Sequence, residues 1–315
     1  MRVRHLFCVL CSVALLVSLC MGDAGAGPAR YLAAAKSEGK WGFIDAKGAW
    51  AIPPKFDGVI NFAANGLALA VTNGKLGVID AKGEWVIPPK FDSAGVFAAN
   101  GLAPVLSEGK WGFIDAKGEW AIPPTFHFVR GFAANGLAPA LAERGGKMGC
   151  IDAKGAWMIP PKFDILWEFA ANGLAPAASE EKWGVVDARG EWVVPPMFDE
   201  LWDFAANGMA PAKSDGKWWG FIDAKGKWAI PPKFDSATLF AVNGLAAVKS
   251  NGKWGVIDAK GKWAIPPQFD EVRTFAANGL AAAKSKGKWG VINTKGEWTI
   301  PPKFDNVIKF QAIEQ

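Results

Sequence analysis

Residues that could carry out catalysis are scarce in this sequence of 315 residues. Beyond residue 26 the chain has one histidine, His127, and one cysteine, Cys150, so a Ser–His–Asp or Cys–His arrangement would have a single possible base. His127 occupies a position where other parts of the chain have an aspartate, such as Asp57. Nothing near Cys150 would activate its thiol, and we expect a small buried side chain there. The sequence therefore predicts no catalytic residue, and it contains no zinc or phosphate-loop motif.

Aspartates recur in two rows along the chain. The first row is Asp45, Asp80, Asp115, Asp152, Asp187, Asp223 and Asp258, and the second is Asp57, Asp92, Asp164, Asp199, Asp235, Asp270 and Asp305. Acid–base catalysis needs two acids whose environments separate their pKa values, whereas identical acids at identical turn positions indicate turn capping. Glycosidase-type chemistry is the alternative interpretation. A calcium loop is not predicted, because each turn offers one carboxylate beside a lysine. We expect no enzyme, no metal and no cofactor.

Basic side chains recur with the same regularity. One row is Lys40, Lys75, Lys110, Lys147, Lys182, Lys217, Lys253 and Lys288, and the other is Lys47, Lys82, Lys117, Lys154, Arg189, Lys225, Lys260 and Lys295. The main interpretation is that these cations pair with the neighbouring aspartates and keep the surface soluble. The alternative is a ladder of charge that meets an anionic polymer of the cell envelope.

Tryptophan is the other abundant candidate for binding. Eight tryptophans recur at one position, as is typical of core residues, and they are Trp50, Trp85, Trp120, Trp157, Trp192, Trp228, Trp263 and Trp298. Trp167 and Trp202 differ because they stand in two connecting segments only, and Trp218 and Trp219 follow closely. Aromatic residues are enriched at binding hot spots. We therefore predict a ligand-binding region formed by Trp167, Trp202, Trp218, Trp219, Lys182 and Lys217.

These residues are positioned by an internal repeat of about 35 residues. Eight glycines mark its copies at intervals of 35 to 37 residues, namely Gly42, Gly77, Gly112, Gly149, Gly184, Gly220, Gly255 and Gly290. Each copy predicts three short strands, for example 102–106, 110–115 and 120–122, joined by turns that contain glycine. A glycine inside the second strand predicts close approach of another backbone or of a large ring. Pro123 and Pro124 are expected to end the third strand.

Three elements recur in fixed order, namely Lys-Trp-Gly-Phe-Ile-Asp at 110–115, a Gly-x-Trp-x-Ile-Pro-Pro-x-Phe-Asp element, and Gly-Leu-Ala. Together they resemble the bacterial WG repeat, also called the KWG repeat. The resemblance covers residues 31 to about 310 and implies an all-β repeat surface. No single copy has a core of its own, so the eight units must stack on one another. We predict either a propeller-like ring or an open β-superhelix, a solenoid. The chain begins with a first strand and ends after a third, which leaves no strand demanding ring closure.

The N-terminal segment carries an export signal. Arg2 and Arg4 precede an apolar run over 6–20, and small residues at 24–26 form a cleavage site, which together are typical of a secretory signal peptide. Lipid attachment at Cys20 is the alternative, although Leu19 does not fit that pattern. We expect residues 1–26 to be the signal, 27–305 the repeat domain and 306–315 a C-terminal tail that caps an open end or latches a ring.

Composition and the expected export signal together indicate a binding protein of the bacterial envelope. The formal net charge is +5, with acids and bases interspersed, which does not favour nucleic acid. No segment beyond the signal is long and apolar enough to span a bilayer. We predict an exported, non-enzymatic scaffold for protein partners, in the periplasm, on the cell surface or secreted. The alternative is binding of an envelope polysaccharide or peptidoglycan through exposed tryptophans and the lysine ladders.

Overall fold

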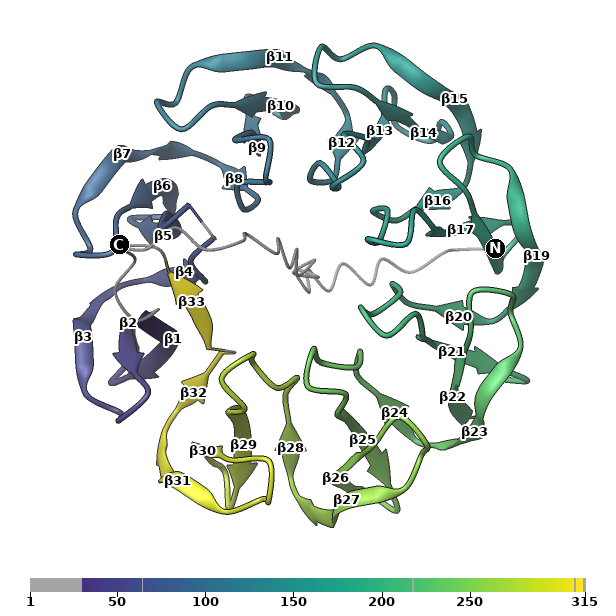
Figure 1. Cartoon of the computed structure of the whole chain (residues 1–315). Coiled ribbons are helices and arrows are strands. Elements are labelled where there is room, and N and C mark those ends of the chain that lie inside the picture. The colour runs from purple at the N-terminus through teal and green to yellow at the C-terminus, as the bar shows by residue number, and fades with distance from the viewer. Residues whose placement is uncertain (1–29, 64, 217, 309, 314–315) are drawn as a thin grey trace, which may run out of the picture.

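The computed structural model describes residues 30–63, 65–216, 218–308 and 310–313, and these residues form a closed ring of eight β-sheets (Figure 1). The expected signal over 1–26, including Cys20, lies outside the described residues, as does Lys217. Seven sheets have four strands and the eighth has five, and all strand pairs within them are antiparallel. The arrangement is an eight-bladed β-propeller, which settles the choice between ring and superhelix.

Each blade is built from an inner, a second, a third and an outer strand, counted from the centre of the ring (Figure 1). The inner strands are β32 (Asn306–Val307), β4 (Gly58–Ile60), β8 (Ser93–Ala94), β12 (Phe128–Val129), β16 (Ile165–Leu166), β20 (Glu200–Leu201), β24 (Ser236–Ala237) and β28 (Glu271–Val272) for blades 1 to 8. The second strands are β1 (Arg30–Ser37), β5 (Ala68–Thr72), β9 (Ala103–Ser107), β13 (Ala138–Leu141), β17 (Ala175–Ser179), β21 (Ala210–Ser214), β25 (Ala246–Ser250) and β29 (Ala281–Ser285).

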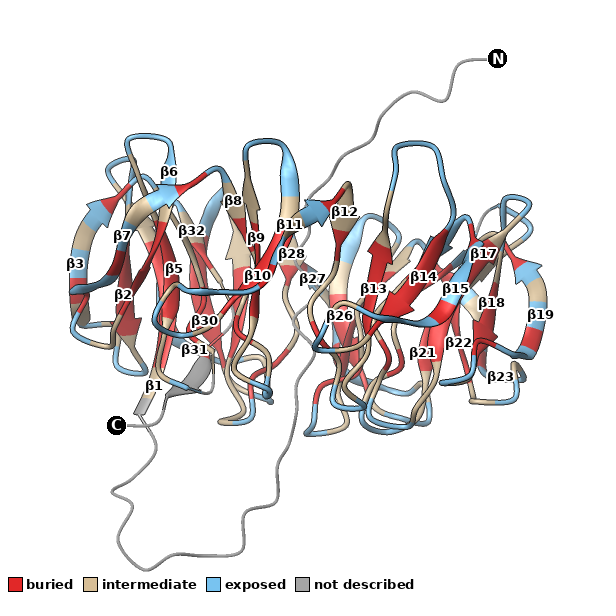
Figure 2. Cartoon of the chain, turned by 90° about the horizontal axis from the view of Figure 1, so that it is seen from above, coloured by how far each residue is buried: buried red, intermediate tan, exposed pale blue. Residues whose placement is uncertain are grey.

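The third and outer strands complete the blades. The third strands are β2 (Lys40–Asp45), β6 (Lys75–Ile79), β10 (Lys110–Ile114), β14 (Met148–Ile151), β18 (Lys182–Val186), β22 (Trp218–Ile222), β26 (Lys253–Ile257) and β30 (Lys288–Ile292). The outer strands are β3 (Trp50–Phe56), β7 (Trp85–Phe91), β11 (Trp120–Phe126), β15 (Trp157–Phe163), β19 (Trp192–Phe198), β23 (Trp228–Phe234), β27 (Trp263–Phe269) and β31 (Trp298–Phe304). Seen edge-on, the blades stand side by side with turns on both faces of the ring (Figure 2).

The second strands show why neighbouring blades need each other. Side chains alternate along a strand, and both faces of β1 are buried. Ala33 and Ala35 lie in one core cluster with Trp289 of blade 8, while Ala34 lies in another with Phe62, which precedes β5 of blade 2. Small alanines on both faces let flanking blades approach closely, so each core belongs to two blades.

The glycine of the third strand is required by a backbone contact, as its position predicted. A Cβ added at Gly112 would lie 2.5 Å from the carbonyl oxygen of Ile122 and 2.8 Å from the backbone nitrogen of Pro124. The outer strand crosses here through an irregularity, because its partners step from Phe113↔Ile122 to Trp111↔Phe126. The extra outer-strand residues, which include both prolines, bulge over the glycine.

Two expectations about the strands were wrong. The strand expected to stop at Pro123 and Pro124 continues through them to Phe126. Proline is tolerated there because the outer strand is an edge, where a missing N–H group breaks no ladder on the solvent side. Each blade also has a fourth strand, the inner one, which was assigned to a connecting segment. It is usually two residues long, as in β12, and is too short to show an alternating pattern.

Ring closure uses the C-terminal segment, so the expectation that no strand was left over for closure was also wrong. β32 pairs with β1 through Ala35↔Val307 and Lys36↔Asn306, and β33 (Gln311–Ile313) pairs with the start of β1. The inner strand of blade 1 therefore comes from the far end of the chain. Of the two roles expected for residues 306–315, latching a ring is the one that these pairings perform.

Candidate functional site

The eight recurring tryptophans form the seams between blades. Each begins an outer strand and packs edge-on against the phenylalanine that ends the preceding outer strand, with ring centroids 5.5 to 6.4 Å apart. Trp50 and Phe304 make the same contact between blades 1 and 8, where the ring closes. Several of these rings remain partly exposed, for example Trp120 at 41%. None of the eight side chains is buried, so the expectation that they are core residues was wrong. Their rings instead contribute to the contacts between neighbouring blades.

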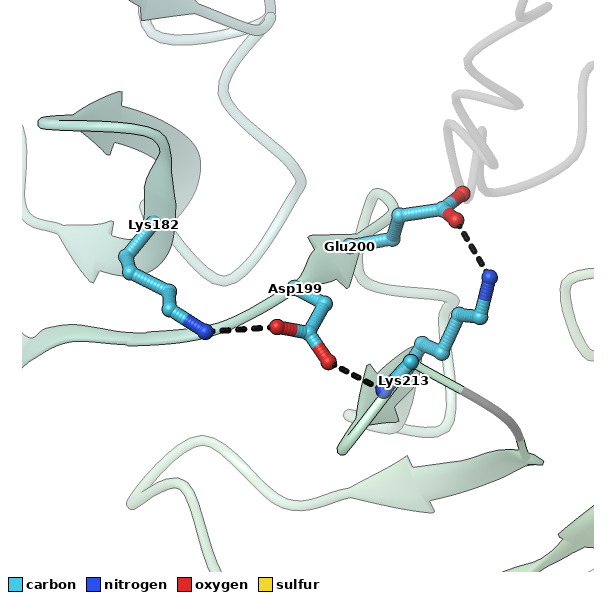
Figure 3. Close-up of polar contacts among 5 residues, drawn as sticks. Lys182, Asp199, Glu200 and Lys213 are labelled. Carbon is cyan, nitrogen blue, oxygen red and sulfur yellow. Dashed lines mark hydrogen bonds and ion pairs between the residues drawn. The ribbon is translucent and has the colours of Figure 1, made fainter.

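The first lysine row pairs with the second aspartate row. Lys182 Nζ lies 2.6 Å from Asp199 Oδ1 on the link between β19 and β20, and the nearby Lys213 pairs with Glu200 (Figure 3). This hydrogen bond from Lys182 holds the pKa of Asp199 below its usual value. Equivalent pairs join Lys40–Asp57, Lys75–Asp92, Lys147–Asp164, Lys253–Asp270 and Lys288–Asp305. These lysines already have a carboxylate partner, and exposed pairs of this kind contribute little to stability because solvent screens them.

The tryptophans predicted as a ligand site are brought together only in part. Trp202 and Trp219 pack edge to face at 5.9 Å. Trp167 packs instead against Trp183, with centroids 6.3 Å apart. Trp218 and Trp219 are consecutive on β22 and take opposite faces, so Trp218 is 46% exposed while Trp219 is 7% exposed. The predicted region is therefore not a single site. Trp167, Trp202 and Trp219 pack against other rings, whereas Trp218 faces the solvent.

A polar cluster that the sequence analysis did not assign lies beside Trp167 and Trp202. We define the inner-rim cluster as Arg130, Trp167, Glu168, Trp202 and Asp203, which directly follow the inner strands of blades 4, 5 and 6. The guanidinium carbon of Arg130 stacks 3.9 Å from the centroid of Trp167. Glu168 Oε1 accepts a hydrogen bond of 3.1 Å from the backbone N–H of Gly131, which ties blade 5 to blade 4.

The two acids of the cluster have raised pKa values, in contrast to repeated aspartates such as Asp199, whose pKa is lowered. Burial, and then the negative charge of Asp203, raises the pKa of Glu168 to about 7, although Arg130 opposes the shift. Burial raises the pKa of Asp203 to about 6, again opposed by Arg130. The signal for these residues was available in the sequence, because acids replace Gly131 and Leu239 of the equivalent positions in blades 4 and 7. The sequence did not predict their role, because an acid in a connecting segment is usually an exposed surface residue.

A second distinctive surface lies on the outside of the ring. We define the outer-wall patch as Trp157, Met158, Trp192, Val193 and Met197, on the outer strands β15 and β19 of neighbouring blades. Met158 is 59% exposed and Met197 is 57% exposed. Lysine is the commonest residue at the position of Met197 in the other blades, where it stands at Lys55, Lys90, Lys162, Lys233 and Lys303. At Met197 the wall has therefore exchanged a charge for a flexible apolar side chain, and Met158 is a larger apolar side chain than the alanine or valine of most other blades.

Cys150 is expected to be unreactive in the native protein. It lies fully buried in the core of blade 4, and burial raises the pKa of its thiol to about 12. A thiolate is the reactive species, so a chain that starts at Gly27 should show no reaction with a disulfide reagent near neutral pH until denaturant is added. Rapid labelling of the native protein, followed by absorbance, would contradict this burial.

Neither metal nor membrane sites stand out in the part of the chain that the structure describes. Within those residues, no group of three or more His, Cys, Asp or Glu side chains is arranged to hold a metal ion. No helix there is long and apolar enough to cross a bilayer.

Comparison with known proteins supports the fold and names the family. Among solved structures, the dihydro-heme d1 dehydrogenase NirN in complex with DHE is similar with a TM-score of 0.62 and 12% identity, over 90% of this chain and 75% of that one. AztD from Citrobacter koseri has a TM-score of 0.56 and 12% identity, over 91% and 98% of the two chains. BamB from Moraxella catarrhalis has a TM-score of 0.52 and 13% identity, over 84% and 93%. At such identities the likeness concerns the fold alone.

The sequence itself matches one family model repeatedly. No curated protein matches the chain. The model described as "WG containing repeat" matches residues 41–75, 77–111, 111–142, 148–183, 183–218, 219–254, 254–289 and 289–311. These eight consecutive matches cover nearly all of the described ring, in agreement with the resemblance seen in the motifs. The chain therefore belongs to the WG-repeat family, and its eight repeats build an eight-bladed β-propeller.

Proposed function

We propose that this propeller is an exported, non-enzymatic scaffold that binds a protein partner through the outer-wall patch. The observation that carries the proposal is the concentration of exposed apolar side chains on β15 and β19. Interfaces are enriched in aromatic residues and methionine and depleted in lysine, and methionine adapts its shape to a partner. Export rests on the signal-like segment over 1–26.

The wall is suited to side-chain contacts and unsuited to strand addition. Every outer strand carries two consecutive prolines, so part of its outward edge lacks N–H donors. A partner strand could not continue the ladder past this point. The exposed Met158, Val193 and Met197, together with the partly exposed rings of Trp157 and Trp192, instead offer apolar side chains on two neighbouring outer strands.

Binding of an envelope glycan is the second candidate function. Tryptophans Trp85, Trp120 and Trp263 are each more than a third exposed, as a sugar-binding surface requires. The lysine ladder gives this candidate less support, because six lysines of the first row are already paired with aspartates. Contacts with a neutral glycan would therefore come from the aromatic seams.

The test compares capture by two matched double variants. Met158→Lys/Met197→Lys should lose at least about tenfold in affinity for a partner taken from an envelope extract of the source organism, because charge would be forced against an apolar interface. Lys55→Met/Lys90→Met changes the outer wall of blades 1 and 2 in the opposite sense and should leave that affinity unaltered. Quantitative pull-down followed by titration of the captured protein measures both.

Two results would overturn the proposal. Equal capture by both double variants would remove the outer-wall patch from consideration. Co-sedimentation with isolated peptidoglycan sacculi, unaffected by Met158→Lys/Met197→Lys and lost on removal of the exposed seam ring Trp120, would favour the glycan candidate instead.

A further inference from the structure

The inner-rim cluster departs from the repeat in a way that packing of the ring does not require. The residue that precedes the phenylalanine after each inner strand is Asn61, Val96, Gly131, Glu168, Asp203, Leu239, Thr274 and Lys309 in order along the chain. Apolar or small residues serve at several of these positions. Two carboxylates occur in succession, and each is preceded by a tryptophan that is found at this position in no other repeat.

Two atoms of the cluster are buried without a hydrogen-bond partner among the described residues. They are the carboxylate oxygen Oδ1 of Asp203 and the indole Nε1 of Trp167. Buried polar atoms are almost always hydrogen-bonded in native proteins. One of these atoms is an acceptor and the other is a donor, so one ligand that carries both a donor and an acceptor would satisfy the pair.

The net charge of the cluster determines the sign of the charge that the ligand must carry. Ionised Glu168 and Asp203 contribute two negative charges, while Arg130 contributes one positive charge, which leaves an excess of one negative charge. Arg130 is held over the ring of Trp167, and Glu168 Oε1 is engaged with the N–H of Gly131. Asp203 is thus the acid with a free acceptor. An anion would be repelled here, and a cation would compensate the excess.

We propose that the inner-rim cluster binds a small protonated amine that carries a hydroxyl group beside its nitrogen, such as a 2-amino sugar. The ammonium group donates to Asp203 Oδ1. A neighbouring hydroxyl oxygen accepts from Trp167 Nε1, and the half-buried ring of Trp202 covers the carbon skeleton. This site lies on the inner side of blades 4 to 6, away from the outer strands, so it does not depend on the proposed protein-binding function.

Binding at this site is expected to weaken in acid. Glu168 and Asp203 have pKa values raised to about 7 and about 6, so both are largely ionised near pH 7.5 and largely protonated near pH 5. The charged group that faces them from blade 4 is Arg130, which keeps its charge over this range. An amine stays protonated as pH falls, so the loss of affinity reports the two acids.

Calorimetric titration of the full chain with glucosamine tests the proposal, with glucose as the neutral probe. We expect glucosamine to bind at about pH 7.5 at least about tenfold more tightly than glucose, and to lose at least about tenfold in affinity at about pH 5. Asp203→Asn should lose about tenfold or more at about pH 7.5. Asp199→Asn removes a neighbouring acid that is paired with Lys182 outside the cluster, and it should bind like the wild type.

Two further measurements distinguish a loss of binding from a loss of folding. Asp203→Asn should unfold at the same temperature as the wild type or higher, because it removes a buried carboxylate whose desolvation outweighs its attraction to Arg130. Trp167→Phe keeps an aromatic ring, removes the N–H donor, and should weaken glucosamine binding about tenfold, which decides the matter if Asp203→Asn does not fold. The proposal is overturned if the wild type does not bind glucosamine, if glucose binds equally well, or if folded Asp203→Asn binds like the wild type.

Discussion

Gly112→Ala is expected to lower the free energy of unfolding by about 3 kcal/mol or more, a loss reserved for a few mechanisms such as overpacking. The new Cβ would stand 2.5 Å from the carbonyl oxygen of Ile122 and 2.8 Å from backbone atoms of Pro123 and Pro124. Those atoms belong to the main chain of the outer strand, so no side-chain rotation relieves the overlap. β10 and β11 would have to separate, which also disturbs the seam between Phe91 and Trp120.

Gly109→Ala is the matched control in the same blade. Gly109 has a φ of +77° in the turn before β10, and a Cβ there would meet nothing within 4 Å. Its cost is conformational only, about 1 kcal/mol. Urea denaturation of both variants separates the two mechanisms. Similar losses for Gly109→Ala and Gly112→Ala would mean that the outer strand moves aside easily.

Ending the chain after Asp305 is expected to have an even larger effect, a loss of about 5 kcal/mol or more. Truncation removes β32 and β33, the partners of β1, and with them the fully buried Val307 and Phe310. Loss of a buried phenylalanine side chain alone costs about 3–5 kcal/mol. Since folded domains are stable by only about 5–15 kcal/mol, the truncated ring should be largely open or unfolded under native conditions.

Small-angle X-ray scattering and urea denaturation together test this prediction. The radius of gyration should rise and the urea midpoint should fall for the chain that ends at Asp305. A chain that ends at Ile313 keeps both closing strands and serves as the control. An unchanged midpoint for the shorter chain would show that pairing with β1 contributes nothing to the stability of the ring.

The sequence repeat predicted the eight β units correctly, but it did not determine whether they close into a ring. Regular spacing of Gly42 to Gly290 correctly indicated eight β units, and the glycine in each third strand correctly indicated close backbone approach. Closure was harder to predict, because whether repeats stack open or closed depends on the small rotation between neighbours, which no residue pattern encodes directly. The inner strands were hidden for a similar reason, since two residues such as Phe128 and Val129 become a strand only when a second strand lies beside them.

The residues of the candidate site were likewise predictable from the sequence only in part. Trp167 and Trp202 were found because they break the repeat, and the pairing of Lys182 with Asp199 agrees with the solubilising interpretation of the lysines. Glu168 and Asp203 were harder to single out, because isolated acids on a sequence look like ordinary surface residues. Their unusual chemistry arises from burial and from Arg130, which lies more than 35 residues earlier in the chain and is brought near only by the curvature of the ring.

The pairing of β1 with β32 also fixes the order in which this protein can be completed. The strand that emerges near the start of the chain waits for a partner that emerges almost last, so seven blades can form before the first one is whole. During that interval the inner edge of β1 has free backbone groups able to pair with another chain. Contacts of such long sequence separation are formed slowly. We therefore expect this chain to fold most efficiently where newly made polypeptides are kept apart until their two ends have paired.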